Sequence, residues 1–191
     1  MTTSLVRRVL GAALVGAAAI TGLTGAATPA FAADVTDQVV RVFSDNTVLQ
    51  PDRSAPGAAI RAVARIGKAD DTPDSQVWKR RPARQPGFFT LVHAPSDGDR
   101  PLCIDVDGDS TQAGAALVLR PCDGTDSQAW RQLVSVPPSH LENKQSGLKM
   151  EVVGGRLVQN EFAGRNDADR KQRNDRQLLF IQPKSFGVGG A

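Results

Sequence analysis

Cysteine is the residue type in this chain whose number and spacing point most directly to a definite chemistry. The 191 residues include two cysteines, Cys103 and Cys122, which lie at the ends of two short apolar stretches, residues 102–106 and 115–122. Paired strands lie about 4.8 Å apart, and a disulfide needs Cα atoms roughly 4.4–6.8 Å apart. We therefore predict a hairpin-like unit closed by a Cys103–Cys122 disulfide, with two buried free thiols as the alternative.

An acidic stretch directly follows the first cysteine. Asp105, Asp107 and Asp109 have the spacing with which a calcium-binding loop begins. An EF-hand loop also needs Gly at its sixth position and Glu at its twelfth, and Ser110 and Ala116 occupy these positions here. The stretch is therefore interpreted as a solvated turn between two strands.

The remaining chemically active residues lack the spacing of a metal or catalytic site. His93 and His140 are far apart, and no His-x-x-x-His or Cys-x-x-Cys pattern is present. No Gly-x-Ser-x-Gly motif or glycine-rich phosphate loop appears either. We expect no metal, no cofactor and no enzymatic activity.

Residues 1–32 have the pattern of a secretory signal peptide. Arg7 and Arg8 form a basic start, an apolar run follows from 9 to 23, and residues 30–32 (AFA) form a small-x-small cleavage site. The run is too short and too rich in Gly and Ala for a convincing membrane span. We predict cleavage after Ala32 and an extracellular protein, whose oxidising surroundings favour the disulfide.

The mature part, residues 33–191, has the length of one domain. We divide it into a lead-in at 33–36, a domain at 37–185 and a loose tail at 186–191. Removing the two signal arginines lowers the net charge from +3 to +1, too little to attract nucleic acid or anionic membranes. No second long apolar run is present, so we expect no membrane span, and we expect a monomer.

The mature sequence reads as an all-β protein with many turns. Aromatic residues make up 5% of the chain, Tyr is absent, and there are 18 Gly and 12 Pro. Short apolar runs separated by Gly, Pro, Asp, Asn and Ser are typical of strands joined by turns. A polar loop is expected at 163–174. The predicted strands cover residues 39–43, 47–49, 58–65, 76–79, 88–92, 102–106, 115–122, 131–134, 148–152, 155–159 and a closing segment at 175–181.

A closing segment recurs three times. It reads DSQVW at 74–78, DSQAW at 126–130 and DRQLL at 175–179, so the glutamines Gln76, Gln128 and Gln177 are 52 and 49 residues apart. Such a period indicates repeated units that share one core. Three units of about four strands predict a threefold barrel with a hairpin cap, and the third unit is expected to begin at 131. Trp78 and Trp130 would fill the core, with Leu179 in the third copy, while each glutamine amide bonds turn backbone.

These features resemble the ricin B-type β-trefoil lectins, as in a secreted bacterial member of that family. The likeness rests on the repeated Gln-x-Trp, the LCIDV opening at 102–106 and the Arg-Pro-Cys before the second Gln-x-Trp. It covers about residues 35–185 and is strongest in the second repeat. The resemblance implies a β-trefoil fold and a shallow sugar pocket in at most one place per repeat.

The resemblance assigns candidate carbohydrate-binding residues in the second repeat. Asp105 matches the family's acceptor of sugar hydroxyls, and Gln128 belongs to the Gln-x-Trp motif. Arg120 stands where an aromatic ring usually stacks on the sugar and could instead bond hydroxyls or pair with Asp105. Ser127 stands where Asn is common. The third repeat offers Glu151, which aligns with Asp105.

Two functional hypotheses from different classes follow. The first is a secreted, non-catalytic carbohydrate-binding module whose partner is a glycan or a cell-surface polysaccharide. The alternative is a β-trefoil that has lost sugar recognition and serves as a protein-binding or inhibitor scaffold, because fold alone does not decide function. The missing aromatic at Arg120 favours the alternative, and the retained Asp105 favours the lectin.

Overall fold

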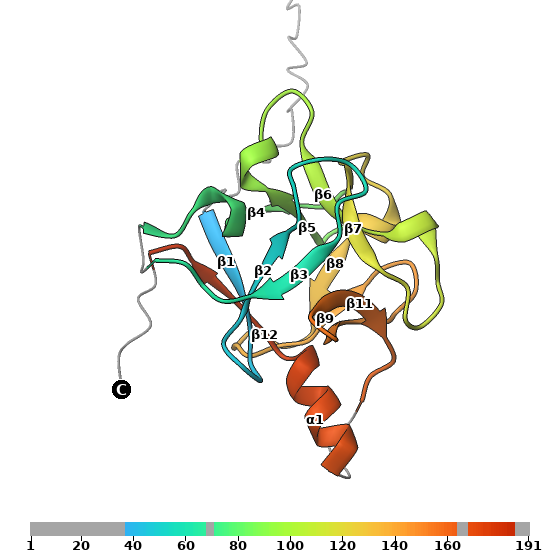
Figure 1. The fold of residues 1–191 in the computed structure, drawn as a ribbon. Helices are drawn as coiled ribbons and strands as arrows, with labels where there is room; N and C mark the ends of the chain where they lie inside the picture. The colour runs from blue at the N-terminus through green and yellow to red at the C-terminus, as the bar shows by residue number, and fades with distance from the viewer. Residues whose placement is uncertain (1–36, 68–70, 164–167, 186–191) are drawn as a thin grey trace, which may run out of the picture. The chain divides into compact units, whose positions relative to one another are not determined.

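The computed structural model describes residues 37–67, 71–163 and 168–185 (Figure 1). The predicted signal peptide (1–32), lead-in (33–36) and tail (186–191) lie outside these described residues. The strands are β1 (Asp37–Val42), β2 (Val48–Pro51), β3 (Ile60–Val63), β4 (Trp78–Pro82), β5 (Phe89–His93), β6 (Leu102–Val106), β7 (Leu117–Pro121), β8 (Trp130–Gln132), β9 (Leu141–Asn143), β10 (Lys149–Val153), β11 (Arg156–Asn160) and β12 (Leu179–Pro183). The helices are the short 3-10 turns η2 (Asp74–Gln76), η3 (Ala94–Ser96), η4 (Asp107–Asp109) and η5 (Asp126–Gln128), and the α-helix α1 (Ala168–Gln177).

The described strands form three consecutive repeats of four, β1–β4, β5–β8 and β9–β12. The outer strands of the repeats join into a ring through the pairs β12–β1, β1–β4, β4–β5, β5–β8 and β8–β9. A bridge between Ser139 and Leu179 closes the ring just before β9. A closed ring leaves no exposed strand edge. The predicted all-β trefoil is therefore confirmed.

The inner strands of each repeat form a hairpin, and the three hairpins contact one another. Gly154 and Gly155 make the tight turn of the β10–β11 hairpin, with φ angles of 56° and 75°, as a two-residue type I′ connection requires. The hairpins meet at Arg61–Arg156, Ala59–Val118 and Ala116–Val158.

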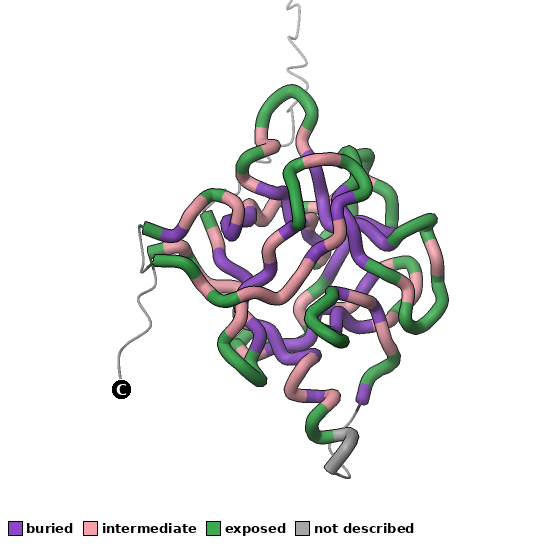
Figure 2. Tube along the Cα trace, in the orientation of Figure 1, coloured by how far each residue is buried: buried purple, intermediate pink, exposed green. Residues whose placement is uncertain are grey.

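One apolar core draws on all three repeats. Figure 2 shows the buried stretches mainly on the strands and the exposed ones mainly on loops and turns. Trp78 and Trp130 are fully buried at the start of a closing strand, and Leu179 takes the same place in the third repeat. The indole N–H of Trp78 donates to the carbonyl of Leu49 (2.9 Å), and that of Trp130 to the carbonyl of Ile104 (3.4 Å). The predicted core role of the Gln-x-Trp aromatics is thus confirmed.

The closing glutamine of the second repeat makes a set of contacts that the other two repeats share. Gln128 is fully buried. Its Nε2 donates to Asp105 Oδ2 (3.0 Å) and to the carbonyl of Pro121 (2.8 Å), and its Oε1 accepts from the backbone N–H of Asp123 (3.0 Å). One side chain therefore ties β6, the end of β7 and the following turn together.

The first repeat makes the same three contacts. Gln76 donates to Gln50 Oε1 (3.0 Å) and to the carbonyl of Ala64 (3.0 Å), and it accepts from the N–H of Ile66 (2.9 Å). Sequence reasoning missed Gln50, because its side chain is neutral where the other repeats have an acid.

The third repeat makes them again. Gln177 donates to Glu151 Oε2 (3.0 Å) and to the carbonyl of Glu161 (2.7 Å), and it accepts from the N–H of Ala163 (3.1 Å). In all three repeats the acceptor carbonyl and the donor N–H lie two residues apart in the sequence. We call this set of contacts the glutamine clasp.

The expected polar loop at 163–174 and closing segment from 175 are wrong in one respect. Helix α1 covers Ala168–Gln177, and the strand begins only at Leu179. The sequence ADRKQRNDRQ has no apolar stripe, which is the main signal of a helix in sequence. Its Ala, Arg, Lys and Gln residues are nevertheless good helix formers, and Lys171 pairs with Asp175 one turn later (2.9 Å).

The expected start of the third repeat at 131 is also wrong. Strand β8, Trp130–Gln132, closes the second repeat, and the third repeat begins at β9 with Leu141. Leu133 and Val134 suggested a strand, but both are exposed in the connecting loop. Apolar side chains in this stretch therefore do not indicate a buried strand.

The Cys103–Cys122 disulfide is present, with 5.1 Å between the Cα atoms. It joins β6 to the residue that follows β7, as predicted. Within the described ranges, no helix combines the length and the apolar character needed to cross a lipid bilayer.

We expect the disulfide to contribute substantially to stability. It links residues 19 positions apart, and a closed loop of this size restricts the unfolded chain by about 3 kcal/mol. The paired replacement Cys103→Ser and Cys122→Ser should lower the free energy of unfolding by that amount, as measured by urea unfolding followed by circular dichroism. An equal unfolding midpoint for the oxidised wild type and the double variant would contradict this.

The glutamine clasp should also contribute strongly. Gln128→Ala removes the hydrogen bonds of the clasp and leaves buried backbone groups without partners, so we expect a loss of about 2–4 kcal/mol. Gln85→Ala is the matched control, because Gln85 is exposed and should change stability by less than about 0.5 kcal/mol. Thermal and urea unfolding of the two variants measure the difference, and equal values would show that the clasp is not stabilising.

Candidate functional site

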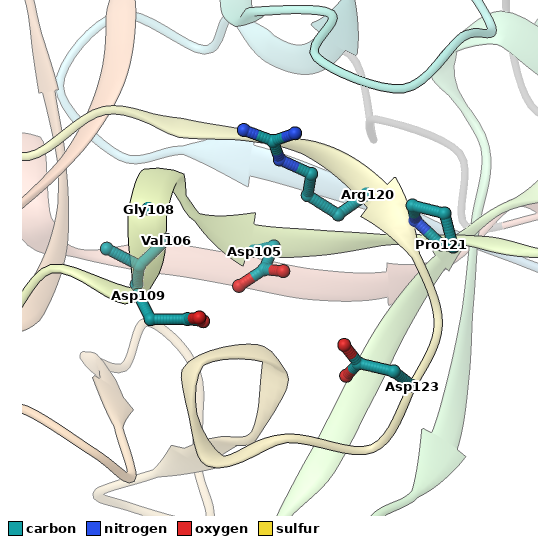
Figure 3. Close-up of a pocket in the computed structure, with 7 residues that line it drawn as sticks. All are labelled: Asp105, Val106, Gly108, Asp109, Arg120, Pro121 and Asp123. Carbon is teal, nitrogen blue, oxygen red and sulfur yellow. The ribbon is translucent and has the colours of Figure 1, made fainter.

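A pocket of about 390 Å³ opens beside the second repeat's hairpin (Figure 3). Strand β6 supplies its floor, the η4 turn forms one wall, and the end of β7 with the following loop forms the other. Figure 3 shows the side chains that line it. They are Asp105, Val106, Gly108, Asp109, Arg120, Pro121 and Asp123.

The alternation of strand β6 determines how Asp105 is placed. Ile104 and Val106 belong to the apolar core, and residues on either side of them along a strand point to the opposite face. Cys103 and Asp105 therefore share the face away from the core, and Cys103 is held there by the disulfide. The same strand thus fills the core and presents a carboxyl group to the pocket.

The Asp105 carboxyl group has one oxygen engaged and one available. Asp105 is 5% exposed, and its Oδ2 accepts from Gln128 Nε2 (3.0 Å). Its Oδ1 is buried and makes no hydrogen bond with the described part of the chain. Buried polar atoms are nearly always hydrogen-bonded, so this oxygen is suited to accept a hydrogen bond from a ligand.

Burial raises the pKa of the Asp105 carboxyl above its usual value. The hydrogen bond from Gln128 and the proximity of the Ser127 hydroxyl lower that pKa, and the negative charges of Asp109 and Asp123 raise it. The net direction is upward, so desolvation and neighbouring acids outweigh the hydrogen bonds. The two acids are therefore close enough to influence the Asp105 carboxylate.

Arg120 lines the pocket, but its charge is committed elsewhere. Its side chain is 44% exposed, and Nη2 lies 2.5 Å from Asp107 Oδ1. In Figure 3 the guanidinium is directed away from Asp105. The ion pair considered between Arg120 and Asp105 is thus replaced by one with Asp107.

Ser127 and Gln128 lie behind the pocket and not on its surface. Both are fully buried. The Ser127 hydroxyl is hydrogen-bonded to the Thr125 hydroxyl (2.9 Å), and its carbonyl accepts from Asn143 Nδ2 (2.8 Å). Of the four predicted sugar-contacting residues, the structure brings Asp105 and Arg120 to the pocket and places the other two in its support.

Sequence reasoning missed Asp109 and Asp123. Asp109 was assigned to a solvated turn, and its backbone has a positive φ of 51°. Asp123 lies in the turn after the disulfide, where Gln128 holds its backbone N–H (3.0 Å). The sequence did offer one indication for Asp123: it directly follows Cys122, and the predicted disulfide to Cys103 would place it near β6.

The equivalent carboxylate in the third repeat is neutralised by the chain itself. Glu151 is 1% exposed, and its Oε1 lies 3.3 Å from Arg176 Nη2 and 3.9 Å from Arg173 Nε, both on helix α1. Asn160 Nδ2 also donates to Oε2 (3.0 Å). Helix α1, which the sequence did not predict, therefore supplies the positive charges that compensate the carboxylate of Glu151.

The two histidines have structural partners. His93 is buried, its Nδ1 contacts Ser54 Oγ (2.9 Å) and its Nε2 contacts the carbonyl of Ser75 (3.3 Å), and burial lowers its pKa. His140 Nε2 contacts Asn174 Oδ1 (2.9 Å). Within the described ranges, no group of three or more His, Cys, Asp or Glu side chains is arranged to hold a metal ion.

Solved structures share this architecture at low sequence identity. The designed threefold-symmetric protein ThreeFoil matches with 19% identity over 76% of this chain and 97% of its own, with a TM-score of 0.63. The Rhizoctonia solani agglutinin matches with 15% identity over 79% of this chain and 96% of its own, with a TM-score of 0.60. At such identities the likeness shows the fold alone.

An enzyme also contains this fold as part of a longer chain. An exo-beta-1,3-galactanase from Clostridium thermocellum matches with 18% identity and a TM-score of 0.63, over 78% of this chain and 30% of its own. The chain therefore spans less than a third of that enzyme.

Sequence comparison relates part of the chain to a known family. No curated protein matches the sequence. A family model described as ricin-type beta-trefoil lectin domain-like matches residues 74–163, which include the whole second repeat, its disulfide and the Asp105 pocket. Together with the three clasped repeats, this match shows that the β-trefoil of this chain contains a ricin-type beta-trefoil lectin domain-like region at residues 74–163.

Proposed function

We propose that the chain is a secreted, non-catalytic carbohydrate-binding module whose site is the Asp105 pocket. One observation carries the proposal. Asp105 lines an open pocket, and its buried carboxylate oxygen Oδ1 makes no hydrogen bond with the described residues. A sugar hydroxyl is a donor of the required kind, and the lectin family match supports this reading.

The surrounding residues have distinct parts in this proposal. Asp105 accepts a hydrogen bond from the sugar, and Arg120 presents its stem and exposed guanidinium at the edge of the pocket. Gln128 and Ser127 are positioning residues, because they hold Asp105 and the adjacent turn without reaching the pocket. The seven lining residues include no aromatic ring, so binding lacks the stacking contact of a flat apolar face and should be weak for a single site.

Secretion is part of the proposal. The basic start, apolar run and small-x-small site within residues 1–32 support export, and the disulfide suits an oxidising compartment. The mature module would then meet glycans or cell-surface polysaccharides outside the cell.

A second candidate is a protein-binding trefoil that no longer recognises sugar. The absence of an aromatic ring from the pocket lining favours it. Leu133, Val134 and Val136 are also exposed on the loop between β8 and β9, and exposed apolar residues suit protein contacts. The glycan experiment below separates the two candidates.

Asp105→Asn should abolish or sharply reduce glycan binding. Loss of a charged acceptor costs about 1.5–3 kcal/mol, or at least about tenfold in affinity, for hits found on a glycan array and measured by calorimetry. Asp99→Asn is the matched control, because Asp99 is exposed and lies outside the Asp105 pocket. Full affinity in Asp105→Asn would remove the site assignment, and a folded wild type without any glycan hit would favour the protein-binding candidate.

Acidification should weaken binding before the carboxyl groups of ordinary surface residues protonate. The folded pKa of Asp105 lies above its usual value of 3.8, so the carboxylate is lost as the pH falls through this raised pKa. The folded state then binds the proton more tightly than the unfolded state, so protonation of Asp105 adds to stability down to about pH 3.8. As the pH falls through this window, the affinity for the sugar should therefore decrease while the free energy of unfolding increases.

Calorimetric titration of the sugar and thermal unfolding across this pH range measure the two effects on one sample. In the Asp105→Asn variant the stability response assigned to Asp105 should disappear. A wild-type affinity that stays constant down to pH 3.8 would contradict the role of the carboxylate.

A further inference from the structure

We propose that the Asp105 pocket selects a sugar with a free, protonated amino group, that is, a hexosamine that is not N-acetylated. This inference rests on the proposed function, because it names the class of sugar that the same pocket would take. It is based on two observations: acidic side chains surround Asp105 in the pocket, and no basic side chain among the lining residues pairs with them.

The first observation is the convergence of carboxylates on one space. Asp105, Asp109 and Asp123 come from β6, the η4 turn and the loop after β7, and all three line the pocket. Figure 3 shows their carboxyl groups directed toward a shared region. Between η4 and the disulfide, the chain thus surrounds one small volume with negative charge.

The second observation is that these carboxylates lack counter-ions. In the described part of the chain, neither Asp109 nor Asp123 takes part in a salt bridge, and Asp105 Oδ1 makes no hydrogen bond there. Arg120 is the cation at the pocket edge, but it pairs with Asp107 (2.5 Å) and points away from the three acids. A cationic ligand group would supply the missing positive charge.

An ammonium group fits this arrangement better than a hydroxyl group does. It carries three N–H donors, so it can bond to Asp105 Oδ1 and still lie within reach of the flanking carboxylates. Charge-assisted hydrogen bonds are roughly twice as strong as neutral ones. Because no lining residue offers a stacking ring, electrostatic attraction is the main source of affinity that this pocket can provide.

The other repeats lack this character. In the first repeat the clasp partner is the neutral Gln50. In the third, Arg176 and Arg173 already compensate Glu151. The selectivity for a cation is therefore a property of the second repeat.

A metal ion is the competing cationic occupant. Among the residues that the structure describes, no three carboxylate, imidazole or thiol side chains are arranged to ligate one. The three acids surround a space of about 390 Å³, which is large enough for a sugar ring and too open for direct coordination by all of them. The geometry therefore favours an organic cation.

The test compares matched sugars on the full mature protein with its disulfide intact. Calorimetry at pH 6.5 and low salt would measure methyl glycosides in the gluco and galacto series, each with a 2-amino, a 2-acetamido or a 2-hydroxyl group. We expect the amino sugar of one series to bind about tenfold more tightly than its two neutral counterparts. Raising the salt from about 0.02 M to about 0.5 M should reduce this preference, because exposed charges are screened.

Charge-neutral variants assign the preference to the pocket. Asp109→Asn and Asp123→Asn keep side-chain size, and Asn tolerates the positive φ at position 109. Each should lower affinity for the amino sugar by about threefold and lower affinity for the neutral sugars by less, so that the preference for the amino sugar falls. Asp99→Asn removes the same charge outside the pocket and should change neither.

The outcomes separate this inference from the proposed function. Equal, Asp105-dependent binding of amino and acetamido sugars would overturn the amine inference and leave the lectin function standing. Binding that a chelator abolishes and Ca²⁺ restores would assign the charge to a metal and also overturn it. If no sugar of either series bound in an Asp105-dependent way, both the inference and the proposed site would fail.

Discussion

The glutamine clasp is the interaction on which both the fold and the site depend. In each repeat one buried amide joins the second strand, the end of the third strand and the backbone two residues further on. An amide has two donors and an acceptor with two lone pairs, so a single side chain satisfies groups on three segments at once. No carboxyl or hydroxyl side chain offers that combination, which explains why Gln recurs although the neighbouring aromatic is replaced by Leu179.

The clasp also determines what each repeat can present to a ligand. The clasp glutamine donates to one oxygen of the side chain on the second strand. The repeats differ in what the other polar atoms of that side chain contact. In the second repeat, Asp105 keeps an oxygen that makes no hydrogen bond with the described residues. In the third, Arg176 takes the free oxygen of Glu151 (3.3 Å). Similar backbones thus carry three different electrostatic surfaces.

The sequence predicted the repeats well and the site only in part, for physical reasons. Closing glutamines at a near-constant period and apolar runs between turns are local signals, so the trefoil and the disulfide could be inferred. Helix α1 could not, because it has no apolar stripe and forms from helix propensity and contacts with the rest of the third repeat. Gln50 was missed because only the folded clasp reveals that a neutral amide can replace an acid. Asp123 was missed because its place depends on the disulfide.

The pocket is lined by an ion-paired arginine and by no aromatic ring, and this limits what kind of recognition is physically available there. A ring binds the apolar face of a sugar through burial, which is largely insensitive to charge. Here Arg120 is held by Asp107 (2.5 Å), so its positive charge does not offset Asp109 and Asp123. The pair thereby preserves the negative potential around Asp105 and leaves the pocket without a stacking surface. With uncompensated acids and no ring among its lining residues, this pocket could offer a ligand charge but not a flat apolar face.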